Sequence, residues 1–285
     1  MINGDFCITG IVRKNGESIF KNNDTTLMAQ TEKMKLEIYP DQQAGSVAVA
    51  KRIAEVIREK NAKGQTAVLG LATGSSPLKV YAELIRMHRE EGLSFKNVKT
   101  FNLDEYYGLT RDNDQSYWYF MHHNLFDHID IPAENVHIPD GTVALDKVES
   151  WCEDYEKAID AAGGLDFQLL GIGRTGHIGF NEPPSDPQSK TRMIHLHEIT
   201  KKDAAPAFGG FDNVPSSAIT MGVGTIMKAR CIILMAWGAN KAEIIARTVE
   251  GEMSDQVPAT YLKAHPNTLV VLDEPAAAQL TGEQK

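Results

Sequence analysis

A glycine-rich run near the middle of the chain contains residue types that can move protons. The run is LLGIGRTGHIGFNEPPS, and it holds His177 and Glu182 among several glycines. Histidine changes its charge near neutral pH, and a nearby carboxylate can hold the imidazole in one tautomer. A lone loop histidine more often has only a structural role. Glycines, a histidine and a glutamate together at the end of an apolar stretch favour catalysis instead.

An acidic pair, Asp104 and Glu105, follows the apolar run VKTFNL. On a strand, adjacent side chains point to opposite faces, so one of the two carboxyl groups is expected to be partly buried. Burial raises the pKa of a carboxyl group, which suits a general base. The alternative is that these acids only cap a helix or lie in a loop.

A third stretch, GLATGSSP at 70–77, has the composition of a turn that could bind an anion. Gly74 permits a tight turn, Ser75 and Ser76 offer hydroxyl groups, and the free N–H groups of the following helix favour negative charge. The run is not a Walker A loop, because the Gly-Lys-Ser/Thr ending is absent. Alone, it could equally be an ordinary turn in which a serine caps the helix. The chain also lacks a G-x-S-x-G nucleophile elbow, which disfavours acyl-enzyme chemistry.

The elements that must position these residues alternate in type along the chain. Short, nearly continuous apolar runs separated by helical patterns predict an α/β fold, a single three-layer, Rossmann-like domain with a central, mostly parallel sheet. A helix is expected to begin at Pro77, with Leu78, Tyr81 and Ile85 on one side. Ligands bind outside the carboxyl ends of strands in such sheets, where the three candidate stretches lie. The expected strands lie at 35–40, 66–71, 98–107, 167–173, 217–225, 231–238 and 268–275.

Composition restricts the class of protein further. The chain has 285 residues, 42% of them hydrophobic, which suits one large α/β domain. Residues 1–34 are polar and aperiodic and are interpreted as a loose or accessory extension, followed by one domain at 35–285. A net charge of −9 without a basic cluster argues against a nucleic-acid partner. No apolar stretch has transmembrane length. Three widely spaced cysteines give neither a metal site nor a disulfide framework, and a cytoplasmic location fits them best.

Several motifs, in their order along the chain, resemble the glucosamine-6-phosphate deaminase (isomerase) family. FNLDEYYGL followed by GHIGFNEP is highly specific for it, and the resemblance extends from about Lys35 to the C-terminus. The related 6-phosphogluconolactonases share the fold but are expected to carry a different run after Gly-His. The other matching pieces are LGLATGSSP, QSYWYFMHHNLFDHIDIPAENVHIPDG, SKTR, AITMGVGTI and LDEP.

The resemblance implies an aldose–ketose isomerisation, without cofactor or metal, that ends in loss of ammonia from glucosamine 6-phosphate. Asp104 would take the proton from C2 and return it at C1. His177 would assist opening of the pyranose ring, with Glu182 as its partner. The enzyme would be an isomerase and hydrolase with a small phosphosugar as partner, and homo-oligomerisation is left open. The residues implied to hold the phosphate are Thr73, Gly74, Ser75 and Ser76.

The chain departs from the family pattern beside its histidine and at its phosphate site. Thr175 stands where most members have an aspartate of the ring-opening relay, so the relay is expected to rest on Glu182 alone. Ser216 stands in place of a phosphate-binding lysine, and an upstream phosphate-binding arginine aligns roughly with Pro206. We therefore predict that Arg174 restores the missing positive charge, with Thr175 as part of the same rearranged binding loop. Losing two charge-assisted hydrogen bonds, each about 1.5–3 kcal/mol, would otherwise weaken phosphate binding severely.

Alternatives remain open for both the cation and the function. Arg174 could instead be a surface side chain paired with an acid, and Lys201, Lys202 and Arg192 are rival cations. Arg192 matches an arginine of the effector site in regulated members, but the lysine two positions later is Ile194, so effector control is not expected. Besides a deaminase, the chain could be an isomerase or lactonase for a related phosphosugar, or a non-catalytic sugar-phosphate sensor.

Overall fold

A seven-stranded parallel sheet forms the centre of the molecule in the computed structural model, which describes residues 34–281. The strand order is β1-β10-β9-β6-β2-β3-β5, and every pairing is parallel. The predicted three-layer α/β fold is therefore confirmed. The strands are β1 (Lys35–Tyr39), β2 (Ala67–Leu71), β3 (Val98–Asn102), β5 (Val136–His137), β6 (Phe167–Leu170), β9 (Ile232–Ala236) and β10 (Thr268–Asp273).

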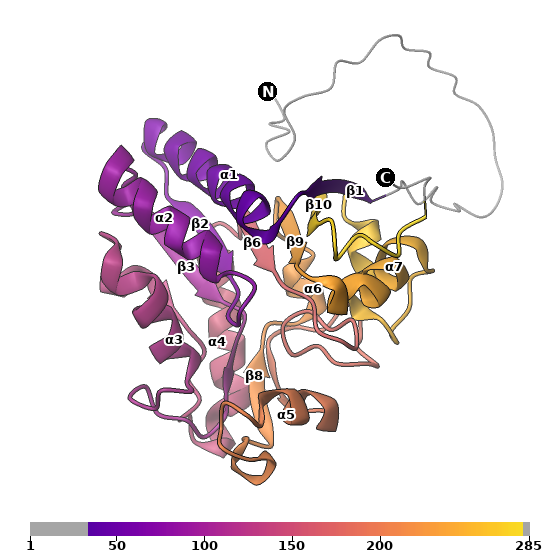
Figure 1. Cartoon of the computed structure of the whole chain (residues 1–285). Coiled ribbons are helices and arrows are strands. Elements are labelled where there is room, and N and C mark those ends of the chain that lie inside the picture. Colours follow the sequence, from indigo (N-terminus) through magenta and orange to yellow (C-terminus); the bar gives the residue numbers. More distant parts are fainter. Residues whose placement is uncertain (1–33, 282–285) are drawn as a thin grey trace, which may run out of the picture.

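Helices cover both faces of this sheet, with α1, α2 and α3 on one side and α7 on the other (Figure 1). Alternate strand residues enter two separate cores, so that Leu69 packs toward α1 and α2 while Val68 faces the opposite core. Burial on both faces explains why the strands are apolar throughout. The helices are α1 (Gln42–Ala62), α2 (Leu78–Glu91), α3 (Tyr117–Asn124), α4 (Val148–Ala161), α5 (Glu198–Ala204), α6 (Val223–Ile226) and α7 (Ala242–Glu250).

Helix α2 buries a different stripe from the one that its sequence suggested. Tyr81 is buried as expected, but its fully buried neighbours are Val80 and Leu84. Leu78 is 37% exposed and Ile85 is half-buried, so the side on which the sequence placed Leu78, Tyr81 and Ile85 is fully buried only at Tyr81. At 100° per residue, Leu78 lies about a third of a turn away from the centre of the buried stripe.

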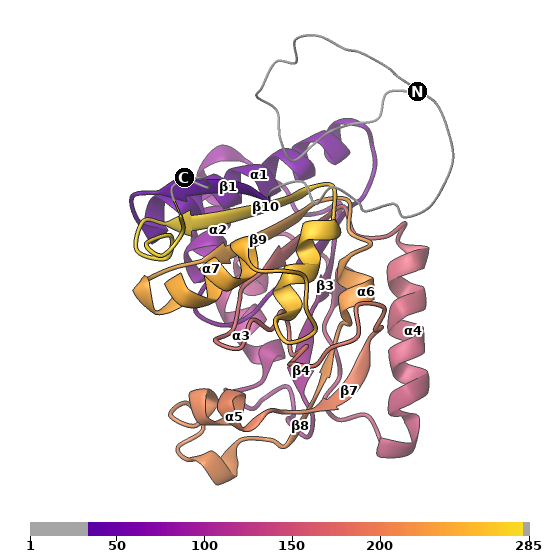
Figure 2. The same ribbon diagram turned by 90° about the vertical axis from the view of Figure 1, so that its right-hand side faces the viewer.

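A second, antiparallel sheet adjoins the main one and extends from it toward α5 (Figure 2). Its order is β4 (Asp104–Tyr106), β8 (Ser217–Thr220), β7 (Arg192–His195). The run at 217–225, expected with the parallel strands, belongs here instead. Leu103 joins the two sheets, because its N–H donates to Leu71 O (3.0 Å) and its carbonyl accepts from Met221 N (2.6 Å). The chain therefore leaves the main sheet immediately before Asp104.

The predicted N-terminal extension lies almost entirely outside the described residues. Residues 1–33 lie outside the described residues, so their role as an extension stays a prediction. Met34, at the predicted end of that extension, is buried in the core beside β1 and is part of the domain. Within 34–281, no helix is long and apolar enough to cross a membrane, and no group of histidine, cysteine and acidic side chains is suited to hold a metal ion.

Candidate active site

Asp104 lies at the junction of the two sheets and is 4% exposed. Burial, with a smaller contribution from the charge of Glu105, raises the pKa of Asp104 to about 8. The loop after β6 passes against it at Gly179, where a Cβ atom would lie 3.3 Å from Asp104 Oδ2 and 3.0 Å from Thr220 Oγ1. Gly179 also has φ of +57°, a conformation that favours glycine. The glycine therefore brings the histidine loop against the buried acid.

Glu105 faces the other way, as the strand geometry predicted. Its carboxylate accepts backbone N–H groups from Tyr106 (2.8 Å), Tyr117 (2.9 Å) and Trp118 (2.9 Å). Burial raises the pKa of Glu105, while these three amide donors favour its charged form. The two adjacent acids therefore have different surroundings. Glu105 binds the start of α3, whereas Asp104 faces the histidine loop.

The imidazole of His177 is held by its own loop. His177 Nδ1 lies 3.0 Å from Glu182 Oε1, as the sequence predicted for this pair. The ring lies over Gly173, where an added Cβ would approach Nε2 to 2.1 Å. Gly176 has φ of +81° and permits the turn between them. The glycines of this motif therefore make room for the ring and set its orientation.

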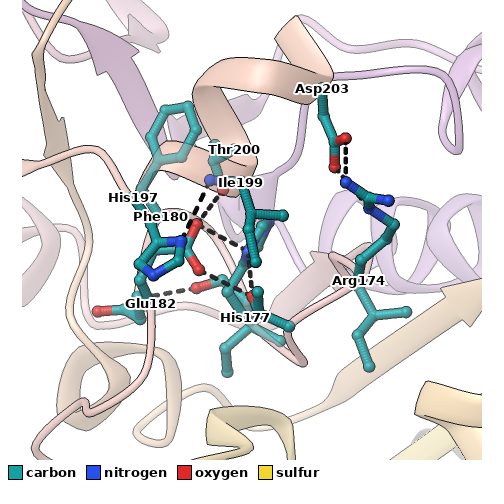
Figure 3. A network of polar contacts seen from close by, with 12 residues as sticks. Arg174, His177, Phe180, Glu182, His197, Ile199, Thr200 and Asp203 are labelled. Atoms are coloured by element: carbon teal, nitrogen blue, oxygen red, sulfur yellow. Dashed lines mark hydrogen bonds and ion pairs between the residues drawn. The ribbon is translucent and has the colours of Figure 1, made fainter.

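Two threonines complete the histidine network, and one of them, Thr200, is labelled in Figure 3. Thr175 Oγ1 lies 2.9 Å from His177 Nδ1 and donates to Glu182 Oε2 at 2.8 Å. Thr200 Oγ1, from α5, donates to Glu182 Oε1. Thr175 therefore contacts both members of the pair, while Glu182 is the one carboxylate among these contacts. The predicted role of Thr175 in phosphate binding stays a prediction. Sequence reasoning missed Thr200, whose only local signal is a polar residue on the buried side of a short helix.

The serine-containing turn after β2 meets the same region. A Cβ atom on Gly171, just after β6, would lie 3.7 Å from Ser76 Oγ, and Trp237 Nε1 donates to Ser76 O at 3.1 Å. Burial raises the pKa of Tyr117, with smaller contributions from Tyr106 and from the charge of Asp104, whereas Thr73 lowers it. The three predicted loops therefore do converge.

The turn also keeps its polar groups outward. Gly74 has φ of +88° and is exposed together with Ser75. The residue that caps α2 is Pro77, so neither serine serves as the helix cap that was considered as an alternative. The absence of a serine cap at α2 is compatible with an anion-binding turn, which stays a prediction.

Arg174 forms a two-pronged ion pair with Asp203 of α5. Arg174 Nε donates to Asp203 Oδ2 at 2.9 Å and Nη2 to Oδ1 at 2.5 Å, and both side chains are about half exposed (Figure 3). This is the surface pairing considered as an alternative. Lys241, which the sequence reasoning did not single out, is half-buried nearby and donates from Nζ to Ile172 O at 2.7 Å. Burial lowers the pKa of Lys241, and the charge of Arg174 lowers it further, whereas Asp203 opposes this.

The rival cations have partners of their own. Lys201 Nζ lies 4.5 Å from the ring centroid of Phe211, and Lys202 pairs with Glu198 at 3.6 Å. Arg192 Nη1 donates to Asn181 Oδ1, in the histidine loop, at 2.9 Å. Arg174 and Arg192 therefore both lie at the histidine loop, Arg174 as part of it and Arg192 through Asn181.

Comparisons with known proteins identify the family of this chain. The family model described as glucosamine-6-phosphate isomerases/6-phosphogluconolactonase matches residues 40–271. A solved structure of a monomeric glucosamine-6-phosphate deaminase matches with a TM-score of 0.83 and 41% identity, over 86% of this chain and 100% of that one. The 6-phosphogluconolactonase of Trypanosoma cruzi matches with a TM-score of 0.71 at 21% identity, which supports the fold alone. The chain therefore belongs to the glucosamine-6-phosphate isomerase/6-phosphogluconolactonase family.

Within this family, the relatives at higher identity carry the deaminase name. Glucosamine-6-phosphate deaminase of Thermoanaerobacter pseudethanolicus is 48% identical over 235 residues, which is 82% of this chain and 92% of the relative. A putative glucosamine-6-phosphate deaminase-like protein of Bacteroides thetaiotaomicron is 46% identical over 262 residues. That match includes 92% of this chain but only 40% of the Bacteroides protein. The chain is accordingly a glucosamine-6-phosphate deaminase-like enzyme.

Proposed function

We propose that this enzyme converts glucosamine 6-phosphate and water into fructose 6-phosphate and ammonia. The observation that carries the proposal is the buried Asp104 carboxyl, which lies against the loop that holds His177 and Glu182. A base for a carbon-bound proton benefits from burial, because desolvation strengthens its affinity for protons. The relatives named as deaminases support the choice of substrate.

The chemistry requires only proton transfers and water. His177 assists proton transfer as the ring opens to the aldehyde. Asp104 removes the proton from C2, which carries the amino group, and the enolamine forms as the C2–H bond breaks and the aldehyde oxygen takes up a proton from water. Return of that proton to C1 leaves an imine at C2. Water then adds at C2 and the C–N bond breaks to release ammonia, so that the isomerisation ends in a net hydrolysis.

The phosphate would bind where the turn at Thr73–Ser76 approaches the loop after β6. Main-chain N–H groups at the start of α2, the two serine hydroxyls and Arg174 are the groups assigned to it. Asp203 occupies the Arg174 guanidinium in the structure, so the phosphate has to displace a carboxylate to reach it. Because phosphorylated sugars do not cross membranes unaided, we place the reaction in the cytoplasm. The mass of the enzyme in solution distinguishes a monomer from a homo-oligomer.

Product analysis separates this function from the alternatives. Purified enzyme should release ammonia and fructose 6-phosphate in equal amounts from glucosamine 6-phosphate. It should leave 6-phosphogluconolactone at the spontaneous rate of hydrolysis. Accelerated lactone hydrolysis without ammonia would identify a lactonase. Ligand binding without any product would identify a sugar-phosphate sensor.

A further inference from the structure

The hydrogen bonds around Glu182 fix where the protons of this network lie. Glu182 Oε1 faces His177 Nδ1 at 3.0 Å and accepts from Thr200 Oγ1, while Oε2 accepts from Thr175 Oγ1 at 2.8 Å. Thr175 Oγ1 also lies 2.9 Å from His177 Nδ1. A hydroxyl has one proton, and that of Thr175 is used on Oε2, so its oxygen can only accept from the histidine.

Both partners of His177 Nδ1 are therefore acceptors. An ionised carboxylate only accepts, and the Thr175 oxygen has no second proton to give. Nδ1 must consequently carry the hydrogen in the neutral imidazole, which leaves Nε2 as the nitrogen that can take up a proton. This assignment follows from the number of donors and acceptors around Nδ1, because the positions of the hydrogens are inferred from the hydrogen-bond network.

Thr200 supplies the second hydroxyl from a different element. It is 8% exposed, and its helix α5 begins at the cap residue His197, whose Nδ1 accepts from Ile199 N at 3.2 Å. Burial alone would raise the pKa of Glu182. The hydrogen bond and charge of His177, followed by the hydroxyls of Thr200 and Thr175, outweigh burial and lower that pKa below its ordinary value.

We propose that Thr175 and Thr200 are positioning residues that clamp the Glu182 carboxylate from both oxygens, so that Glu182 holds His177 as the Nδ1–H tautomer. Thr175 orients the Glu182 carboxylate by a hydrogen bond. An aspartate at this position would instead interact with His177 through its negative charge. Thr200 makes the alignment of His177 depend on the position of α5. The catalytic part of this inference rests on the proposed ring-opening role of His177, whereas the tautomer itself does not.

The first test removes each hydroxyl while keeping the side-chain shape. We expect Thr175→Val and Thr200→Val each to lower kcat on glucosamine 6-phosphate by about tenfold to a hundredfold, with KM changed less than about threefold. The kcat for a substrate analogue that cannot cyclise should stay at the wild-type value. Thr175→Ser and Thr200→Ser keep the donor and should recover most of the activity. Wild-type kcat in the valine variants, or equal losses with the analogue, would overturn the assignment.

The pH dependence provides a readout that a purely structural role would not move. Loss of a hydroxyl donor disfavours the Glu182 carboxylate, so the pH at which Glu182 becomes protonated, followed by ¹³C NMR of its carboxyl carbon, should rise in the valine variants and return in the serine variants. An unchanged Glu182 titration would contradict the proposal. The other titratable and charged groups around this network are His177, Asp104 across Gly179, His197 at the cap of α5, and the Arg174–Asp203 pair.

A spectroscopic measurement tests the positioning independently of turnover. In ¹⁵N-labelled wild-type enzyme at alkaline pH, Nδ1 of His177 should show the shift of a protonated nitrogen and Nε2 that of an unprotonated one. Thr175→Val and Thr200→Val should give mixed tautomers, with the serine variants close to wild type. A protonated Nε2 in the wild type would overturn the proposal. If the tautomer is as expected but no ammonia forms, only the proposed function fails.

Discussion

Asp104 combines two properties that ordinarily oppose each other, a carboxyl group and an apolar, buried place. The chain turns from one sheet into the other at this residue, and its side chain is 4% exposed. With a pKa of about 8, the carboxyl is mostly protonated near neutral pH in the free enzyme. Such a group binds a proton strongly, which suits abstraction from carbon, but it lowers the stability of the fold once it is charged.

Replacing Asp104 by asparagine should separate these two effects. Isomerisation and deamination should fall by about 10²–10⁴-fold or more, because an amide cannot take the C2 proton. The folded-state pKa lies above the ordinary 3.8, so wild-type stability falls as pH rises from about 4 to about 8. Asp104→Asn should therefore have the higher Tm at pH 8, with a smaller difference at pH 4. Calorimetry that shows the difference shrinking as pH rises would contradict this account of burial.

His177 should matter only while the sugar is a ring. His177→Gln should slow turnover of the ring-closed substrate strongly and should affect an analogue that cannot cyclise much less. Stopped-flow and steady-state rates for the two substrates provide the comparison. Equal losses would exclude the ring-opening role and would leave His177 as a general support of the site.

The absence of a side chain at Gly173 should be required for the observed position of the His177 imidazole. A methyl group there would approach His177 Nε2 to 2.1 Å, so Gly173→Ala should displace the ring and reduce kcat by at least about tenfold. Gly171→Ala is a matched control in the same loop, because its methyl group would meet Ser76 Oγ at an ordinary 3.7 Å. Equal activity of the two variants would show that the ring tolerates the shift.

At the scale of elements, helix α5 connects the histidine network to the predicted phosphate site. Thr200 contacts Glu182, and Asp203 three residues later holds Arg174. The position of α5 over this loop could not be predicted from the sequence, since the segment is short, has weak helical periodicity and contacts residues far away along the chain. The His177–Glu182 pair could be predicted because its spacing is local.

The Arg174–Asp203 pair leads to opposite effects of two substitutions. If Arg174 binds the phosphate, Arg174→Ala should reduce the preference for the 6-phosphorylated over the unphosphorylated sugar by roughly 1.5–3 kcal/mol. Asp203→Asn should increase that preference, because it removes the competing carboxylate. Calorimetric titration with both sugars measures it, and Lys202→Ala, on the same helix, serves as the control. If both variants keep the wild-type preference, Lys241 becomes the leading candidate for the phosphate cation.

For the molecule as a whole, the proposed function depends on the junction between the two sheets, where Asp104 lies. The parallel sheet could be predicted because its strands are locally apolar and alternate with helices. The small sheet could not, because β8 pairs antiparallel with β4, which lies far earlier in the chain, and no local pattern records that register. Asp104 could be predicted as a buried acid, but the reason for its burial, the turn from one sheet into the other at Leu103, appears only in the assembled fold.

The most direct test of the central claim follows the proton that Asp104 is proposed to move. Glucosamine 6-phosphate with deuterium at C2 is incubated with the enzyme, and the fructose 6-phosphate and ammonia formed are measured by NMR. The account predicts that the label leaves C2, that some of it appears at C1 in competition with exchange into water, and that Asp104→Asn abolishes both this transfer and the ammonia. Ammonia release with no deuterium at C1, at rates unchanged in Asp104→Asn, would contradict it.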